Sequence, residues 1–154
     1  MRTLTTARLV LEPQVAAHAD AMFAVLSDPA IYAYENAPPA SLAWLRERYR
    51  KLESRASPDG SERWLNWVLR TSDGALIGYV QATVASDAAG IAYEMGSAWW
   101  GRGLAQEAVA AMLDELAGAY GVRTFTAVAK GANVRSRALL ARLGFAQAAA
   151  ATGE

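Results

Sequence analysis

The stretch WWGRGLAQEAV, residues 99–109, places a Gly-Arg-Gly turn directly before an amphipathic helix. Ser, Thr, Asp or Asn is the usual first residue of a helix, and none of them stands here. A glycine turn at a helix N-terminus leaves several backbone N–H groups without intrahelical partners, and the helix dipole there favours an anion. Arg102 adds a positive charge. The stretch therefore predicts either a phosphate- or pyrophosphate-binding turn, or a tight turn that needs its glycines for conformation alone.

The composition limits the classes of protein that could contain this turn. Of 154 residues, 53% are hydrophobic and 19% are charged, which is typical of a globular protein. The length predicts a single domain over residues 1–154. Fifteen basic and fifteen acidic residues cancel, so charge indicates neither nucleic acid nor a membrane surface as a partner. The absence of cysteine excludes disulfides, thiolate metal sites and a Cys-acyl intermediate. The N-terminal MRTLTTARLVLEP resembles neither a signal peptide nor a membrane span, so we expect a cytoplasmic protein, without a bound metal.

Hydrophobic periodicity predicts a chain of alternating strands and helices. Period-two patterns predict strands at residues 5–13, 63–70, 75–84, 89–98 and 121–129. Period-3.6 patterns predict helices at residues 14–28, from about 41, 104–116 and 133–144. This order, with a further strand at the end, is typical of the α/β class with a mixed sheet.

The residue pattern excludes one other phosphate-binding motif and disfavours a second. A P-loop requires G-x-x-x-x-G-K-[ST], and no such string occurs in the chain. The dinucleotide fingerprint requires G-x-G-x-x-G, whereas GRGLAQ has Gln106 at the third glycine position. The turn also follows three β-rich runs late in the chain rather than opening a βαβ unit. Neither a P-loop nor a Rossmann site is therefore expected.

Two blocks of the sequence resemble the GCN5-related N-acetyltransferases, the GNAT superfamily. The family's first block, [Q/R]-x-x-G-x-[G/A], matches WGRGLA at Gly103 and Ala105, with Trp100 in place of Gln or Arg. The second block, N-x-x-S-x-x-L-x-x-x-L-G-F, matches NVRSRALLARLGF at residues 133–145. The spacing of the blocks and the preceding LIGYVQ strand also agree. The resemblance covers nearly the whole chain and is to the branch of ribosomal-protein-alanine N-acetyltransferases, the RimJ/RimL-like proteins.

The resemblance implies a single-domain GNAT fold. This fold has a mixed, mostly antiparallel sheet of six to seven strands with a central splay, flanked by about four helices. The family usually continues past the LGF segment into a last strand that lines the acceptor site. AQAAAATGE contains no β-rich run, so we expect that strand to be missing after about residue 150.

The resemblance implies acetyl-CoA as the acetyl donor, held mainly by backbone groups. The pyrophosphate is implied to bind the backbone of Arg102, Gly103, Leu104 and Ala105, with Gly101 allowing a close approach. The pantetheine arm is implied to pair with the end of the preceding strand, at Met95, Gly96 and Ser97. Asn133 is expected to begin the last helix as its N-cap, and the family adds a hydrogen bond to pantetheine. A module that binds acetyl-CoA without turnover is the alternative.

Direct acetyl transfer needs a base for the amine and a proton for the departing thiolate. The resemblance implies Glu94 as the base, acting through water, and Ser136 as the thiolate's proton donor. The segment between Glu94 and Trp100 is four residues shorter than in relatives, and a slip of one residue would turn Glu94 to the other face. Tyr93 or Glu35 would then lie nearest the amine. The structural alternatives are an outward-facing, ion-paired Glu94 and a solvated Ser136.

The acceptor amine is expected to bind the segment of residues 31–42, where Tyr32 and Glu35 are candidate substrate-binding residues. Trp64 and Trp67 are either part of this cleft or part of the core. One of three arginines on the last helix could reach the CoA 3′-phosphate, namely Arg135, Arg137 or Arg142. A protein N-terminus, an amino acid, a polyamine and an aminoglycoside all remain open as acceptors, as does a homodimer.

Overall fold

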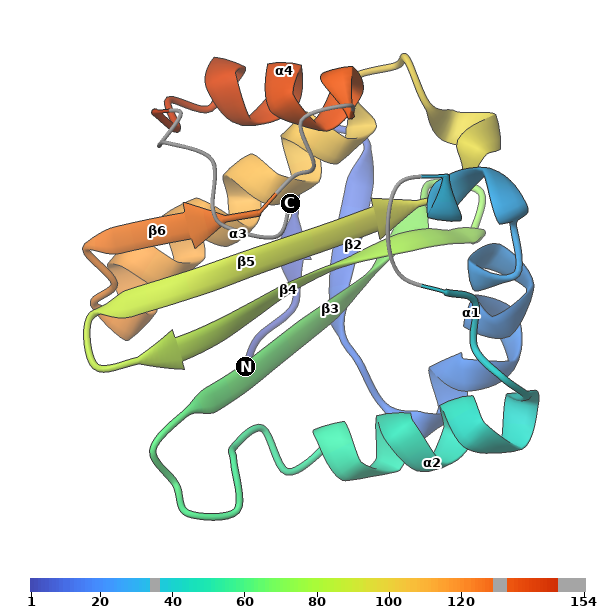
Figure 1. Cartoon of the computed structure of the whole chain (residues 1–154), viewed down its shortest axis with the longest axis horizontal. Helices are drawn as coiled ribbons and strands as arrows, with labels where there is room; N and C mark the ends of the chain where they lie inside the picture. Colours follow the sequence, from blue (N-terminus) through green and yellow to red (C-terminus); the bar gives the residue numbers. More distant parts are fainter. Residues whose placement is uncertain (34–36, 129–132, 147–154) are drawn as a thin grey trace.

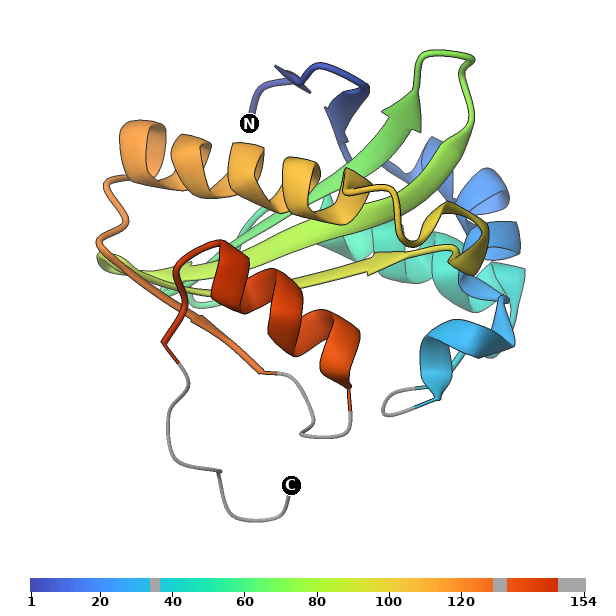
Figure 2. The same cartoon turned by 90° about the horizontal axis from the view of Figure 1, so that it is seen from above.

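The computed structural model describes residues 1–33, 37–128 and 133–146. They form a six-stranded sheet with helices on both faces (Figures 1 and 2). The strands are β1 (Leu4–Thr5), β2 (Leu9–Pro13), β3 (Arg63–Thr71), β4 (Leu76–Ala85), β5 (Ala88–Met95) and β6 (Thr124–Ala127). The helices are α1 (Ala19–Leu26), α2 (Leu42–Leu52), α3 (Leu104–Tyr120) and α4 (Val134–Arg142), with short 3-10 turns η1 (Ala16–His18), η2 (Pro29–Tyr32) and η3 (Ser97–Trp99).

The strands follow one another in chain order across the sheet, β1 to β6. Neighbours are antiparallel except for β5 and β6, which are parallel and connected through α3. The expected mixed, mostly antiparallel sheet with four helices is confirmed. The last strand of the family was expected to be missing after about residue 150, and this expectation falls on residues 147–154, which lie outside the described residues.

The alternation of side chains along the strands divides the core between the two faces. On one face, α3 packs its buried residues, among them Val109, Met112 and Leu116, against Trp67 and Val80 of the sheet. On the other face lie α1 and α2, the blue and teal helices of Figure 2, and their buried residues form a smaller cluster with the sheet. Trp67 is completely buried and its indole N–H donates to the Arg2 carbonyl oxygen at 3.0 Å, so it belongs to the core.

The parallel strands separate after four paired residues. Residues Ala88 to Ile91 of β5 pair with Thr124 to Ala127 of β6, and β5 then continues to Met95 without β6 beside it. Within the described residues, the last four residues of β5 therefore have no strand partner on the β6 side, and the Met95 carbonyl there accepts the Trp100 indole N–H. This is the splay that the resemblance implies.

Three predicted boundaries are corrected by the structure. The strand expected over residues 89–98 ends at Met95. The Gly96 N–H makes a last hydrogen bond to β4 (Ile77 O, 2.9 Å), and the chain then turns into η3. The strand expected over residues 121–129 contains only β6. The first helix begins at Ala19, because η1 precedes it. None of the described helices is long and apolar enough to cross a membrane.

Candidate active site

The Gly-Arg-Gly turn presents a row of free backbone donors. Gly101 and Gly103 have φ angles of +78° and +76°, which L side chains rarely adopt, and Gly103 is the N-cap of α3. The first N–H of this region with an acceptor is that of Glu107, which donates to the Gly103 carbonyl at 3.0 Å. Within the described chain, the N–H groups of residues 101–106 have no hydrogen-bond acceptor. Six successive free donors at a helix N-terminus suit an anion such as pyrophosphate.

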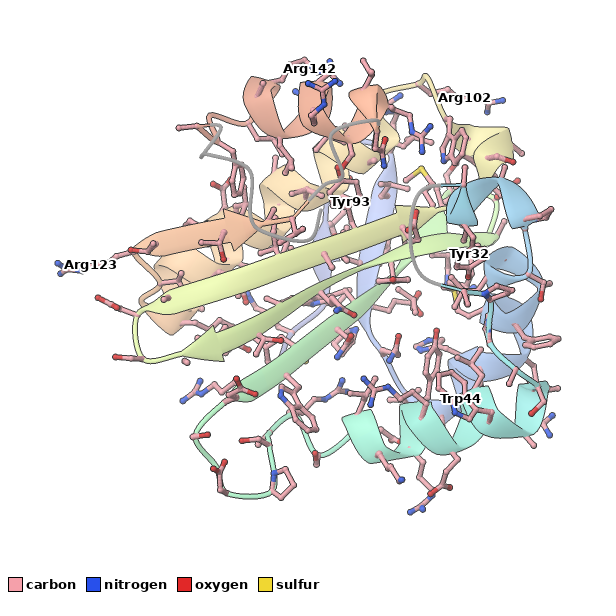
Figure 3. All side chains as sticks on the ribbon, in the orientation of Figure 1. Tyr32, Trp44, Tyr93, Arg102, Arg123 and Arg142 are labelled. Carbon is pink, nitrogen blue, oxygen red and sulfur yellow. The ribbon has the colours of Figure 1, made fainter. Side chains whose placement is uncertain are left out.

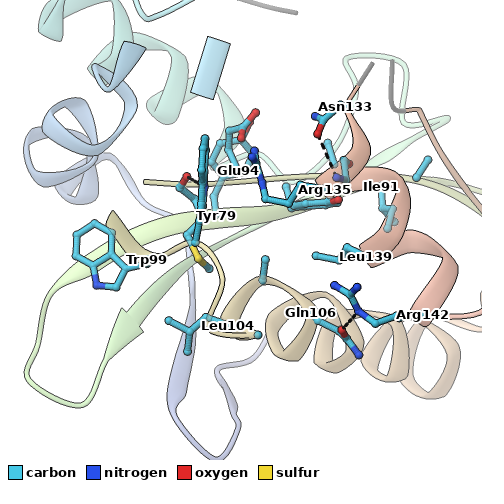
Figure 4. A pocket seen from close by; sticks show the side chains of 18 of the residues that line it. Tyr79, Ile91, Glu94, Trp99, Leu104, Gln106, Asn133, Arg135, Leu139 and Arg142 are labelled. Carbon is cyan, nitrogen blue, oxygen red and sulfur yellow. Dashed lines mark hydrogen bonds between the residues drawn. The ribbon is translucent and has the colours of Figure 1, made fainter. Parts of the chain in front are cut away.

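A cavity of about 310 Å³ lies beside this turn, between the free edge of β5 and the helices α3 and α4 (Figure 4). Eight of the predicted site residues line it: Glu94, Met95, Gly101, Gly103, Leu104, Ala105, Asn133 and Ser136. Tyr93, Trp99, Gln106, Arg135 and Arg142 also line it. Two blocks far apart in the sequence, the turn and the start of α4, thus border the same cavity.

Three of the predicted cofactor residues have other contacts. The Ser97 N–H and hydroxyl both donate to Asp28 Oδ2, at 2.7 and 2.6 Å, and these bonds hold the pKa of the Asp28 carboxyl below its usual value. A Cβ on Gly96 would lie 2.9 Å from the Trp99 ring, so the close approach there is made by that ring. The Arg102 side chain is exposed and points outward (Figure 3). Gly96, Ser97 and Arg102 do not line the cavity.

Ser136 lies in the first turn of α4 and makes two contacts. Its N–H donates to Asn133 Oδ1 at 3.1 Å, which confirms Asn133 as the N-cap. Its hydroxyl is 2.6 Å from the Tyr93 hydroxyl of β5. Burial raises the pKa of Tyr93, although the Ser136 hydrogen bond acts in the opposite direction. The sequence suggested Tyr93 only as an alternative to Glu94, and nothing in its spacing indicated the pairing with Ser136.

Trp100 joins the turn to β5 and α4. Its indole N–H donates to the Met95 carbonyl at 2.8 Å, and the Arg135 guanidinium lies 3.4 Å from its ring centroid. On the same helix, Arg142 Nε donates to Gln106 Oε1 at 2.7 Å (Figure 4). Arg135 and Arg142 therefore bring two positive charges to the cavity, while Arg137 does not line it.

A second cavity, of about 700 Å³, lies on the other face of the sheet between α2 and the strands β3 to β5. It shares Tyr79, Ala92 and Glu94 with the first cavity, so the two spaces meet at Glu94. Tyr32 lines it and donates its hydroxyl to the Leu26 carbonyl at 2.5 Å. Burial, followed by the negative charges of Glu94 and Asp28, raises the pKa of Tyr32 to about 12.

The remaining acceptor candidates lie elsewhere. Glu35 falls outside the described residues. Trp64 is half-buried and donates its indole N–H to Glu62 at 3.1 Å, and neither Trp64 nor Trp67 lines the second cavity. Gln14, Asn66 and Gln81 do line it, although no motif in the sequence indicated them. Only the alternation along β3 and β4 could have indicated that polar residues share this face.

Comparison with known proteins agrees with this geometry. The family model described as the acetyltransferase (GNAT) domain matches residues 8–146. The chain belongs to the GNAT family. No curated protein matches the chain.

Solved structures of GNAT proteins share the fold at low sequence identity. Ribosomal-protein-S5-alanine acetyltransferase from Vibrio fischeri is 17% identical with a TM-score of 0.80, over 95% of this chain and 84% of that one. RimJ from Mycobacterium smegmatis, in complex with CoA-disulfide, is 24% identical with a TM-score of 0.74, over 94% and 75%. An acetyltransferase of the GNAT family from Bacillus anthracis is 15% identical with a TM-score of 0.77, over 93% and 82%. The suspected RimJ/RimL branch is thus represented among the similar structures.

The first cavity fits the acetyl-CoA that the GNAT family uses. The free amides of the turn suit the pyrophosphate, and the unpaired edge of β5 can pair with the amide-containing pantetheine arm. Among the described residues there is no group of three or more His, Asp or Glu that could hold a metal ion.

Proposed function

We propose that this GNAT protein transfers the acetyl group of acetyl-CoA directly to a primary amine. The observation that carries the proposal is the meeting of two cavities at Glu94, one of them lined by the free amides of the glycine turn. Acetyl-CoA supplies a thioester whose carbonyl a neutral amine can attack. An amine bound in the second cavity would reach that carbonyl beside Glu94, near the point where β5 and β6 separate.

Glu94 is proposed as the general base, acting through a water molecule. A substrate amine arrives as an ammonium ion without a lone pair, so a proton has to leave before attack. Glu94 is the one carboxylate among the described residues that line either cavity, so it also supplies the negative charge that attracts the ammonium ion. This assignment explains why an acidic residue stands at the junction of the two spaces.

Ser136 is proposed as the group that returns a proton to the leaving thiolate. It lies on the cofactor side of the sheet, opposite to the second cavity, and its hydroxyl is within 2.6 Å of the Tyr93 hydroxyl. Base and acid are thus separated by the sheet: Glu94 reaches the acceptor side and Ser136 reaches the cofactor side. Such a division lets one group accept a proton and the other donate one in the same turnover.

The lining of the second cavity supports an acceptor with one amine and uncharged polar groups beyond it. Arg48 and Glu94 are its only charged residues within the described chain. Among the described lining residues, a second ammonium ion would meet Arg48 and no carboxylate besides Glu94, which favours an acceptor with one amine over a polyamine or an aminoglycoside. An amino acid or a protein N-terminus fits this lining, and the ribosomal-protein acetyltransferases among the similar structures agree with the latter.

Carboxamide groups in one row of the sheet favour an acceptor that carries carbonyl or amide groups. The backbone N–H of Gln14 donates to the backbone carbonyl of Asn66 at 2.9 Å, and Asn66 pairs in register with Gln81. Gln14 and Asn66 are 3% and 5% exposed, and Gln14 Nε2 has no hydrogen-bond partner within the described chain. Buried polar groups are usually satisfied, so this row is where a bound acceptor would form hydrogen bonds.

The test is release of free thiol from acetyl-CoA across a panel of amines, with CoA binding measured in parallel by titration calorimetry. We expect turnover with single-amine acceptors that carry amide groups, such as short peptides, and little with diamines of equal length. Saturable CoA binding without thiol release for any amine would favour the alternative, a module that binds acetyl-CoA without turnover. If CoA does not bind, the proposal fails.

A further inference from the structure

The turn between β1 and β2 docks on the first turn of α3, about a hundred residues away in the sequence. The Thr6 hydroxyl and the Arg8 N–H both donate to Glu107 Oε2, at 2.5 and 2.8 Å. Arg8 Nε donates to Glu107 Oε1 at 2.8 Å. Both carboxylate oxygens of Glu107 are therefore occupied by this one turn of the N-terminal hairpin.

Arg8 also reaches the glycine turn itself. Its Nη1 donates to the Arg102 carbonyl oxygen at 2.8 Å, and its Nη2 lies 3.4 Å from the position of a Cβ on Gly103. The Arg102–Gly103 peptide is trans, and in a trans peptide the C=O and the N–H point in opposite directions. Holding the carbonyl toward Arg8 therefore points the Gly103 N–H away from Arg8. Gly103 lines the first cavity, whereas Arg8 does not.

The same guanidinium offsets a charge that would oppose an anionic ligand. Glu107 lies in the first turn of α3, beside the free amides of the turn. A carboxylate there is favourable to the helix but repels a phosphate group bound at the same end. Burial tends to raise the pKa of Glu107, but the hydrogen bonds from Thr6 and Arg8 outweigh it, and the pKa is lowered. The negative charge is thus kept and is paired with Arg8.

We propose that Arg8 is a positioning residue for the cofactor turn. It orients the Arg102–Gly103 peptide and neutralises Glu107, so that the turn amides can bind the pyrophosphate of acetyl-CoA. The inference rests on the proposed function for the identity of the ligand. It assigns to the N-terminal hairpin a role in cofactor binding that the glycine motif alone does not reveal.

The experiment measures CoA binding by titration calorimetry on the full chain, without acceptor. Arg8→Met removes both effects, and we expect CoA affinity to fall about tenfold or more, since charged hydrogen bonds to the turn and to Glu107 are lost. Arg8→Lys keeps the charge without the planar fork and should recover part of the affinity. In Arg8→Met/Glu107→Gln, the unpaired carboxylate is gone, so affinity should exceed that of Arg8→Met alone. Arg46→Met is the matched control, because Arg46 pairs with Asp20 on the exposed surface of α2, away from the cavity.

Thermal unfolding without ligand and binding of pantetheine, which lacks the pyrophosphate, separate positioning from general destabilisation. The expected result is a loss of CoA affinity in Arg8→Met, with pantetheine binding and the folded fraction at the titration temperature unchanged. CoA affinity equal to wild type overturns the inference, as does an equal loss for CoA and pantetheine. If Arg8→Met does not fold, the affinities of Arg8→Lys and wild type for CoA and pantetheine are compared instead, with the same expected and contrary outcomes.

The outcomes also separate this inference from the proposed function. Wild-type protein that binds CoA without turnover contradicts the enzyme proposal and leaves the role of Arg8 intact. Wild-type protein that binds CoA while Arg8→Met binds it equally well contradicts the role of Arg8 alone. Wild-type protein that fails to bind CoA contradicts both.

Discussion

The two cavities that meet at Glu94 are built in different ways. The first is bordered by the glycine turn, and the backbone N–H groups of residues 101–106 have no acceptor within the described chain. The second is lined by side chains from α1, α2 and the strands β3 to β5, together with Gln14. A backbone site of this kind tolerates varied side chains but requires glycine at defined φ angles. A side-chain site can change its ligand by single substitutions, so we expect cofactor binding and acceptor choice to separate under mutation.

The largest expected effect is at the junction of the two cavities. Glu94→Gln keeps the size of the side chain but removes the base, so kcat/KM should fall by about 10²- to 10⁴-fold. CoA affinity should stay within about twofold of wild type, because the turn amides are untouched. Steady-state thiol release and CoA titration measure the two quantities. Glu47→Gln, at the exposed ion pair with Arg50, serves as the control and should change neither. Unchanged turnover in Glu94→Gln would place the base elsewhere.

The next largest effect is expected at the hydroxyl pair on the cofactor side. Ser136→Ala and Tyr93→Phe should each lower kcat by about 10- to 100-fold with little change in CoA affinity. If the two hydroxyls act as one unit, the double variant should be only slightly slower than the slower single variant. Additive losses would instead indicate separate roles. Full activity in Ser136→Ala would assign the proton donor to another group.

The role of the glycine turn can be tested by replacing one glycine whose φ angle strains any other residue. Gly103→Ala places a Cβ on a residue with φ +76° and close to Arg8, so we expect about 1 kcal/mol or more of destabilisation and about tenfold weaker CoA binding. Gly60→Ala is a matched control, since Gly60 has φ +75°, with no neighbour within 4 Å of a Cβ, and lines neither cavity. It should share the strain and leave CoA affinity unchanged. Equal CoA affinity in both variants would argue against a binding role for the turn.

Substitutions in the second cavity should change only the KM for the acceptor. Gln81→Leu removes a carboxamide from the second cavity, and the KM for an amide-containing acceptor should rise about three- to tenfold while CoA binding is unchanged. Thr83→Val changes a residue two positions along the same face of β4 that does not line the cavity, and should leave KM unchanged. A rise in KM for both variants would indicate a general distortion of β4.

The smallest effect concerns the contact between Asp28, which begins η2, and Ser97, which begins η3. Hydrogen bonds from Ser97 to Asp28 lower the pKa of Asp28, so their contribution to stability is present above the unfolded value of about 3.9 and is lost as the pH falls through the lower folded value. Asp28→Asn should therefore show less loss of thermal stability than wild type between about pH 4 and pH 2. Parallel melting curves for the two proteins over that range would contradict this role.

Local patterns accounted for most of the fold and for the cofactor side of the site. The change from period two to period 3.6 located the strands and helices, and the N-cap Asn133 was predicted correctly because capping depends on neighbouring residues. The strand predicted to end at Ala98 ends three residues earlier, at Met95. The Trp99 ring against Gly96 and the Asp28 carboxylate on Ser97 favour the turn there, and a linear pattern shows neither contact.

The sequence by itself determined that a glycine turn begins α3 and that a second block begins α4, because a turn and a helix cap are each encoded in consecutive residues. The tertiary structure alone decided the pairing of Tyr93 with Ser136, the contact of Arg8 with the Arg102 carbonyl, and the carboxamide row from Gln14 to Gln81. These partners come from separate elements, and their contacts exist only once strand register and helix packing bring them together. The motif thus identified the family and its acetyl-CoA, while the residues proposed to choose the acceptor and to support the turn follow from packing.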